Sequence, residues 1–170
     1  AKEGSLLTFD PANGKVLRNT RVGASPEGLG LSADGKLLAA AVEDDNSVVL
    51  VEANSGKELA RIKVDGRNPE HAVFSPDGRW IYVSAEEAEQ VDVIDVAKRQ
   101  QVGHILVGKR PRGIAFLADG SRAYVACELA GKVYAIDVAS QKVIAEVTAG
   151  QYPNGVAAHP DGRHVFVSNG

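Results

Sequence analysis

The sequence predicts an all-β fold, a β-propeller built from four-stranded antiparallel blades, and three observations lead to this prediction. A repeat of 42 or 43 residues covers the 170-residue chain. Each repeat holds four short apolar segments separated by turn residues, and none is long enough for an amphipathic helix. Some segments, such as residues 48–51, are apolar on both faces. Four strands in a repeat of this length are typical of a propeller blade packed between two neighbours.

The repeat is marked by a proline followed eight residues later by Asp-Gly. These markers occur four times, at Pro26 with Asp34-Gly35, Pro69 with Asp77-Gly78, Pro111 with Asp119-Gly120, and Pro153 with Asp161-Gly162. An acidic residue ends an apolar segment at the same period, at Asp10, Glu52, Asp95 and Asp137. Residues 1–170 are therefore expected to form a single propeller or propeller segment, with repeats 5–46, 47–89, 90–131 and 132–170.

The third repeat illustrates the four strands, which we expect at residues 112–116, 123–127, 133–137 and 143–147. A tight turn joins the first strand to the second, as in residues 75–78 (Ser-Pro-Asp-Gly), because proline presets φ and glycine accepts a positive φ. Short hairpins join the third strand to the fourth at residues 12–14, 54–56, 97–99 and 139–141. A two-layer sandwich is the alternative fold, but its strands would alternate more cleanly between apolar and polar residues.

The two ends of the chain are expected to be complementary halves of one blade. Residues 6–10 and 16–22 correspond to third and fourth strands, whereas residues 154–158 and 165–169 correspond to first and second strands. The chain therefore holds about four blades, one of them split between the termini. Three arrangements fit: a four-bladed ring closed through the split blade, an eight-bladed ring of two chains, or a segment of a longer propeller.

Composition excludes several functional classes. The net charge is -3, with acidic and basic residues mixed along the chain, so there is no basic stripe for nucleic acid. No apolar run approaches the roughly 20 residues needed to span a membrane. The single cysteine, Cys127, does not indicate a redox compartment. No motif for a phosphate loop, a Ser/His/Asp triad, a metal site or haem attachment is present, so the motifs indicate neither a cofactor nor an enzyme.

Residues 166–169 (Phe-Val-Ser-Asn) resemble the Tyr-Val-Thr-Asn signature of the YVTN β-propeller repeats. Residues 75–79 and 133–137 also look like that repeat, and the resemblance spans the whole chain. It implies a periplasmic, extracellular or cell-surface protein, surface-layer proteins among them. It also implies similarity to the quinoprotein amine dehydrogenase β chain, to the haem-binding propeller of nitrite reductases and to propeller lactonases, although a fold alone does not fix a function.

The resemblance further implies that each first strand lines a central channel and that ligands bind in a funnel at one end of it. The candidate ligand-binding residues of this funnel are Glu27, Glu70, His71, Arg112, Asn154 and Arg67. His71 stands where the other repeats have glycine, so it is a candidate metal or haem ligand, proton carrier or hydrogen-bond partner. The alternative is a histidine bonded to the neighbouring Glu70 or to water.

Charged residues mark the connections at the same end. Glu43, Glu86 and Glu128 begin the loops between second and third strands and are weak candidates for a calcium site, the alternative being a solvated acidic rim. Arg67, together with Lys109 and Arg110, is placed to grip a carboxylate or phosphate, or simply to balance the acidic charge.

We therefore expect a non-enzymatic, extracytoplasmic binding or scaffold propeller whose partner is a protein or small molecule at the funnel. Self-association through the split blade is a further option. The alternative is the propeller of a cofactor-dependent oxidoreductase or a lactonase-like hydrolase with His71 at its site.

Overall fold

The computed structural model describes residues 4–170 and confirms an all-β propeller of antiparallel four-stranded sheets. Blade I comprises β3 (Pro26–Leu31), β4 (Leu37–Val42), β5 (Ser47–Glu52) and β6 (Glu58–Lys63). Blade II comprises β7 (Pro69–Phe74), β8 (Trp80–Ala85), β9 (Gln90–Asp95) and β10 (Gln100–Leu106). Blade III comprises β11 (Pro111–Phe116), β12 (Arg122–Cys127), β13 (Lys132–Asp137) and β14 (Lys142–Thr148).

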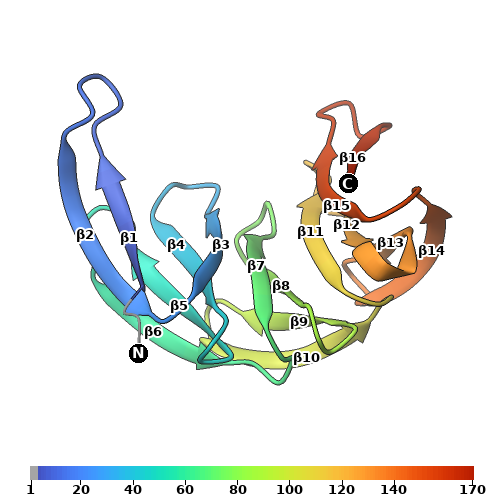
Figure 1. Cartoon of the computed structure of the whole chain (residues 1–170), viewed down its shortest axis with the longest axis horizontal. Helices are drawn as coiled ribbons and strands as arrows, with labels where there is room; N and C mark the ends of the chain where they lie inside the picture. The colour runs from blue at the N-terminus through green and yellow to red at the C-terminus, as the bar shows by residue number, and fades with distance from the viewer. Residues whose placement is uncertain (1–3) are drawn as a thin grey trace.

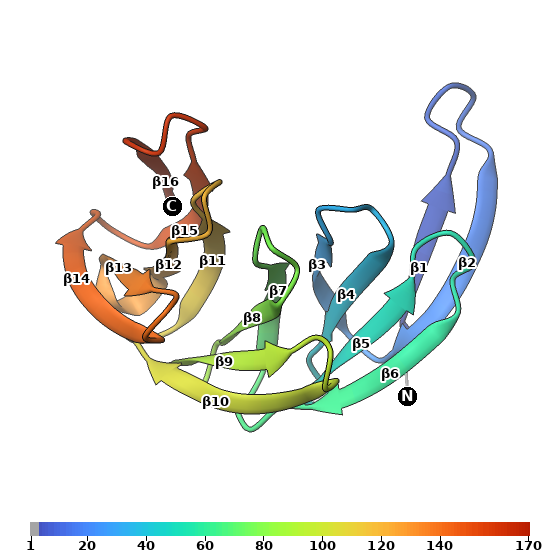
Figure 2. The same ribbon diagram turned by 180° about the vertical axis from the view of Figure 1, so that it is seen from behind.

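Two half-blades flank the three whole blades. The first is β1 (Gly4–Phe9) with β2 (Val16–Gly23), and the second is β15 (Pro153–Ala158) with β16 (Val165–Asn169). Both were predicted, but they form separate two-stranded sheets at opposite ends of an open arc (Figures 1 and 2). In the structure this chain does not by itself close into a four-bladed ring.

The turn chemistry read from the sequence is present in the hairpins. In blade II, the N–H of Gly78 donates to the carbonyl of Ser75 at 2.9 Å, and Gly78 has a φ of 71°. The Asp77 carboxylate accepts the N–H of Arg79 at 3.0 Å and the hydroxyl of Ser75 at 2.5 Å. The aspartate thus fixes the turn, and glycine supplies the left-handed residue that ends it.

The core lies between blades because the central strands bury both faces. On β8, Ile81 and Val83 pack into the cluster shared with blade I, whereas Tyr82 between them packs into the cluster shared with blade III. The Tyr82 ring lies 4.8 Å from that of Phe116 on β11. Side chains of successive strand residues point to opposite faces. This alternation is why sequences apolar at every position form blades rather than a two-layer sandwich.

The first strands of neighbouring blades approach so closely that glycine is needed between them. A Cβ on Gly28 of β3 would lie 2.5 Å from the carbonyl oxygen of Glu70 and 2.7 Å from the Cα of His71, both on β7. On Gly113 of β11, it would lie 2.6 Å from the carbonyl oxygen of Asn154 on β15. Glycine at positions 28 and 113 is therefore a requirement of blade packing.

Helical structure is limited, within residues 4–170, to the short 3-10 segment η1 (Glu128–Ala130). No helix in this part of the chain has the length and apolar character needed to cross a bilayer.

Candidate functional site

The two kinds of connection predicted to share one end of the blades are joined there by backbone hydrogen bonds. The N–H of Glu43 donates to Ser25 at 3.0 Å, and that of Glu86 donates to Asn68 at 2.9 Å. In blade III, the N–H of Glu128 donates to Arg110 at 2.8 Å. The glutamate that begins each second-to-third loop is thereby fixed beside the residue that precedes the proline. We call these connections (residues 23–25, 43–46, 64–68, 86–89, 107–110, 128–131 and 149–152) the rim.

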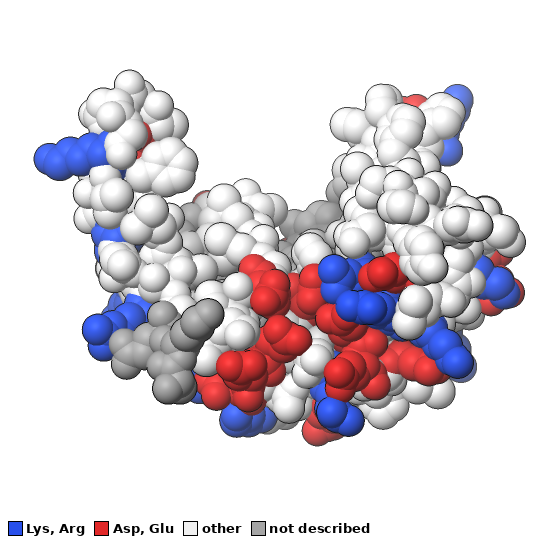
Figure 3. Space-filling model, in the orientation of Figure 1, with Lys and Arg blue, Asp and Glu red and all other residues white. Residues whose placement is uncertain are grey.

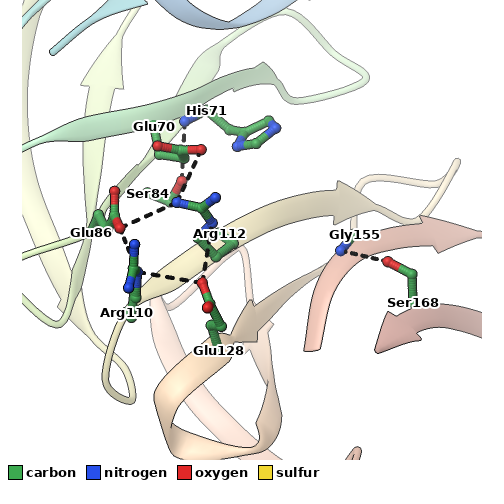
Figure 4. Close-up of polar contacts among 9 residues, drawn as sticks. All are labelled: Glu70, His71, Ser84, Glu86, Arg110, Arg112, Glu128, Gly155 and Ser168. Atoms are coloured by element: carbon green, nitrogen blue, oxygen red, sulfur yellow. Dashed lines mark hydrogen bonds and ion pairs between the residues drawn. The ribbon is translucent and has the colours of Figure 1, made fainter. Parts of the chain in front are cut away.

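Arg112, at the start of β11, lies among three glutamates from two blades (Figure 4). Its Nη1 is 3.2 Å from carboxylate oxygens of both Glu70 and Glu86, and its Nε is 3.5 Å from Glu128. The side chains of Arg112 and Glu70 are only 20% and 12% exposed, so water screens these ion pairs weakly. Arg112 therefore ties blade II to blade III.

Arg110 extends the same cluster toward solvent. Its Nε forms ion pairs with Glu86 and with Glu128, the latter at 3.3 Å. Its backbone is in the left-handed region, with a φ of 58°, directly before the proline that begins β11. We call Glu70, Glu86, Glu128, Arg110 and Arg112 the rim network. Three carboxylates face two guanidinium groups, which leaves one excess negative charge when all five are ionised.

More carboxylates adjoin the rim network than it neutralises. Burial raises the pKa of the Glu70 carboxyl; Arg112 opposes the rise, whereas Glu86, Glu27 and Glu43 add to it. Burial also raises the pKa of Glu43, and the repulsion of Glu27 and Glu86 raises it further. Figure 3 shows the acidic side chains gathered along the middle of this face, with basic side chains beside them. The rim is therefore an acidic surface that its own arginines only partly balance.

The structure brings together part of the predicted funnel. Glu27, Glu70 and Arg112 act on one another electrostatically across neighbouring blades. Arg67 lies farther out and pairs with Glu87 at 2.8 Å in an exposed position. Asn154 lies on β15 behind Gly113, and no contact described for residues 4–170 connects its side chain to the rim network.

His71 lies beside the rim network without joining it. Its backbone N–H donates to the Ser84 hydroxyl at 3.2 Å, and its ring passes close to Gly28. Among residues 4–170, its enclosed Nδ1 has no hydrogen-bond partner, so the ring is not bonded to Glu70 as one alternative expected (Figure 4). Burial, and then the Arg112 charge, lower the pKa of His71. The ring is therefore neutral at neutral pH.

The signature that resembles YVTN has a structural role at one of its positions. Ser168, the third residue of Phe-Val-Ser-Asn, accepts the N–H of Gly155 at 2.9 Å, and Ser84 accepts that of His71 in the same way (Figure 4). Both bonds lie where the register of the first two strands shifts. This hydroxyl satisfies the backbone N–H at an irregularity of the ladder.

The sequence offered charge balance between the basic residues and the acidic rim as one alternative. Arg110 and Arg112 do pair with Glu86 and Glu128, although the individual partners were not predicted. The two glutamates were candidates for binding calcium, but in the structure they direct their carboxylates at guanidinium groups. The sequence did hold a signal for the pairing of Arg110 with Glu128. Arg110 directly precedes a first strand, and Glu128 directly follows the second strand that pairs with it. An open cavity of about 480 Å³ adjoins the network and is lined by Glu86, Glu87, Glu89, Lys109, Arg110 and Leu129.

Comparisons with known proteins agree with this architecture. The family model for the YNCE-like beta-propeller matches residues 2–164. Hydrazine synthase from Kuenenia stuttgartiensis is 30% identical with a TM-score of 0.80, and the alignment covers 84% of this chain and 41% of that one. No curated protein is significantly similar in sequence.

Two further solved structures show the fold alone. The β-propeller domain of Cps50 (Swd1) from Myceliophteria thermophila is 18% identical, with a TM-score of 0.84 over 98% of this chain and 56% of that one. A functionally unknown protein from Desulfotomaculum acetoxidans is 16% identical, with a TM-score of 0.84 over 97% of this chain and 55% of that one. The present chain thus spans about half the length of the solved chains that it matches, or less.

Proposed function

This chain belongs to the YNCE-like β-propeller family, and from that membership we propose that it is a non-catalytic binding module whose acidic rim takes a positively charged partner protein. The observation that carries the proposal is the surplus of carboxylates around Glu43. Burial and repulsion by other carboxylates both raise the pKa of this group, and a cation placed beside it would offset the repulsion and favour the ionised form.

The charge arrangement favours a basic protein surface over an anionic ligand. All three candidate arginines for an anion already pair with carboxylates: Arg110 and Arg112 within the rim network, and Arg67 with Glu87. A face of one predominant sign attracts partners of the opposite sign and increases their rate of association. Lysine and arginine side chains of a partner would meet Glu27 and Glu43 beside blade I.

A lysine-rich peptide provides the test. Labelled hexalysine should bind the chain with an affinity that falls as salt is added, because exposed charges are screened. Glu43→Gln should weaken binding several-fold. Glu52→Gln, which removes the same charge from the turn at the opposite end of blade I, should not. Equal losses in the two variants, or no binding of hexalysine at low salt, would contradict the proposal.

A second candidate function is a module of a redox enzyme with His71 at its site. It is favoured by the 30% identity to a hydrazine synthase, by the lowered pKa of His71, and by its Nδ1, which has no hydrogen-bond partner among residues 4–170. Haemin is the probe: if His71 is a ligand, the absorption spectrum of the mixture should change, and His71→Gly should abolish the change. Glycine is the chosen substitution because the other repeats have glycine at the equivalent positions 28, 113 and 155. An identical spectrum with His71→Gly excludes this candidate.

The proposed location of the binding module is outside the cytoplasm, in the periplasm or at the cell surface. The support for this location is the resemblance to YVTN repeats, which itself stays a prediction. Fractionation of cells that produce the native protein tests it, and recovery in the cytoplasmic fraction would contradict it.

A further inference from the structure

The turn between β15 and β16 differs from the other turns of its kind. It contains His159 and His164 on either side of the shared aspartate, Asp161. At the equivalent first position the other turns have Ser32, Ser75 and Leu117, and at the second they have Leu37, Trp80 and Arg122. Both histidines are thus peculiar to this repeat, and neither is required to form the turn.

The three side chains converge. One Asp161 oxygen lies 3.0 Å from Nδ1 of His159, and the other lies 2.7 Å from Nδ1 of His164. One potential ligand atom from each residue lies within 4.8 Å of the others. The imidazole rings meet edge to face, with centroids 6.0 Å apart. The carboxylate therefore stands between two imidazoles on an exposed hairpin.

We propose that His159, Asp161 and His164 bind a divalent transition-metal ion of the zinc class. Two imidazole nitrogens and one carboxylate oxygen are a donor set that zinc accepts, and three protein ligands leave a position for water. Ligands at about 2.0 Å from a tetrahedral ion lie roughly 3.3 Å from one another. Rotation of these exposed side chains is enough to reach that spacing. Calcium and magnesium are disfavoured because they prefer oxygen ligands.

The backbone of the turn prepares the site. The N–H of Arg163 donates to Asp161 at 2.8 Å and fixes the carboxylate, and this bond, the largest contribution, lowers the pKa of Asp161. The N–H of Asp161 lies 3.1 Å from Nδ1 of His159 and orients this ring beside the carboxylate. A metal ion would replace that contact and the contact between Nδ1 of His164 and Asp161. Because a histidine must be neutral to bind a metal ion, binding should weaken in acid.

Calorimetric titration of the intact chain with Zn²⁺ tests the proposal, with Mg²⁺ as the comparison. The parent should bind one Zn²⁺ and no Mg²⁺. His159→Ser and His164→Leu introduce residues that equivalent turns already contain, so the hairpin is expected to form. Each should weaken Zn²⁺ binding by roughly tenfold or more, the scale on which even outer-shell partners change metal affinity. His104→Asn removes an exposed histidine from β10 and should leave the affinity unchanged.

A second measurement on the parent needs no variant. Zn²⁺ should shift the ring resonances of His159 and His164 in NMR spectra and leave those of His104 in place. Equal affinity in the parent, His159→Ser and His164→Leu would overturn the proposal. So would the absence of Zn²⁺ binding by the parent at millimolar concentration, or shifts confined to other histidines.

Discussion

Gly66 lies where the repeat carries one extra residue, in the connection between blades I and II. Its N–H donates to the buried carboxylate of Asp92 at 3.0 Å, and the same carboxylate accepts the side-chain amides of Gln90 and Gln101. A Cβ on Gly66 would overlap Ala85 and lie 2.5 Å from Asp92. The irregularity of the repeat thus supplies a donor to Oδ2 of this buried acid, whereas the two glutamine amides bind its other oxygen.

Gly66→Ala should therefore lower the free energy of unfolding by about 1–3 kcal/mol, the usual cost of forcing atoms into a packed core. Gly103→Ala is the matched control, because a Cβ there meets no atom within 4 Å. It should change stability by less than about 0.5 kcal/mol. Urea denaturation of both variants measures the difference, and equal stabilities would show that the space around Gly66 is not filled.

Arg112→Met should destabilise the fold more at neutral than at acid pH. The raised pKa of Glu70 means that this group stabilises the fold at acid pH and that the contribution is lost as pH rises through its folded pKa. Removing Arg112 raises that pKa further. We expect Arg112→Met to lower the free energy of unfolding by about 1–3 kcal/mol at neutral pH. This loss is smaller than the full cost of breaking a buried ion pair because the cluster is partly exposed.

The loss of stability should be smaller at about pH 4, where protonation of Glu70 removes part of the charge that Arg112 balances. Urea denaturation at the two pH values checks this. Arg67→Met, which breaks the exposed pair with Glu87, should cost less than about 1 kcal/mol at either pH. A loss independent of pH in Arg112→Met would mean that packing, and not charge, accounts for its role.

At this scale the sequence predicted which residues begin the first strands, and Glu27, Glu70 and Arg112 do gather because each follows the repeat's proline. The partners of Arg112 could not be predicted in the same way. They depend on the register between strands and on side-chain directions across two blades, which the period of the repeat does not specify. The position of the His71 ring was unpredictable for the same reason, because its Cδ2 lies against Gly28 in the first strand of the neighbouring blade.

Single strands and turns were the most predictable elements. The strand expected at 112–116 is β11 (Pro111–Phe116), and that expected at 133–137 is β13 (Lys132–Asp137). Turn residues define these boundaries locally, so no knowledge of packing was needed. The turns between third and fourth strands were less predictable in detail. Arg99 and Gln141 take the left-handed conformation that Gly14 and Gly56 take in the other repeats.

Gln141→Gly should stabilise the hairpin between β13 and β14. Gln141 has a φ of 54°, a conformation that costs a residue with a side chain roughly 1 kcal/mol or more. Glycine removes this cost but adds about 0.4–1 kcal/mol of chain entropy in the unfolded state. We expect a net gain of up to about 0.5 kcal/mol, seen as a higher melting temperature, whereas Gln141→Ala, which keeps the strain, should give no gain. A lower melting temperature for Gln141→Gly would contradict this account.

The open arc is a property of the whole molecule, and the period of the repeat does not determine it. Sequence periodicity specifies that blades stack, and the apolar faces specify that each sheet is covered on both sides. A four-bladed ring, an eight-bladed ring of two chains and a segment of a longer propeller all satisfy these local conditions. The sequence therefore does not choose among the three arrangements. The structure adds the placement of the two half-blades at opposite ends of the arc. Each half-blade region leaves apolar side chains exposed, among them Phe9 at one end and Phe166 at the other.

Part of that uncovered surface lies beside blade III. The outer strands β6 and β10 bury Ile62 and Ile105, whereas all of β14 is exposed, because the half-blade next to it has only β15 and β16. An apolar groove of about 360 Å³ lies there, lined by Tyr124, Val133, Val147, Thr148, Ala149, Val165, Val167 and Asn169. The free edge of β16 borders it. Third and fourth strands placed against that edge would complete a blade, and β1 and β2 of a second copy are such strands.

The 170-residue chain should therefore self-associate, with β1 of one copy added to β16 of another. Each apolar side chain that becomes fully buried contributes about 1.5–3 kcal/mol, which favours association in addition to the new backbone hydrogen bonds. Sedimentation equilibrium at micromolar concentration should give a mass above that of the monomer. Val147→Ser, at a groove residue that is 64% exposed, should shift the distribution toward monomer. Leu106→Ser, at a residue that is 69% exposed on β10 and away from the groove, should not. A parent chain that stays monomeric under these conditions would show that the open edge of β16 is not sufficient for pairing.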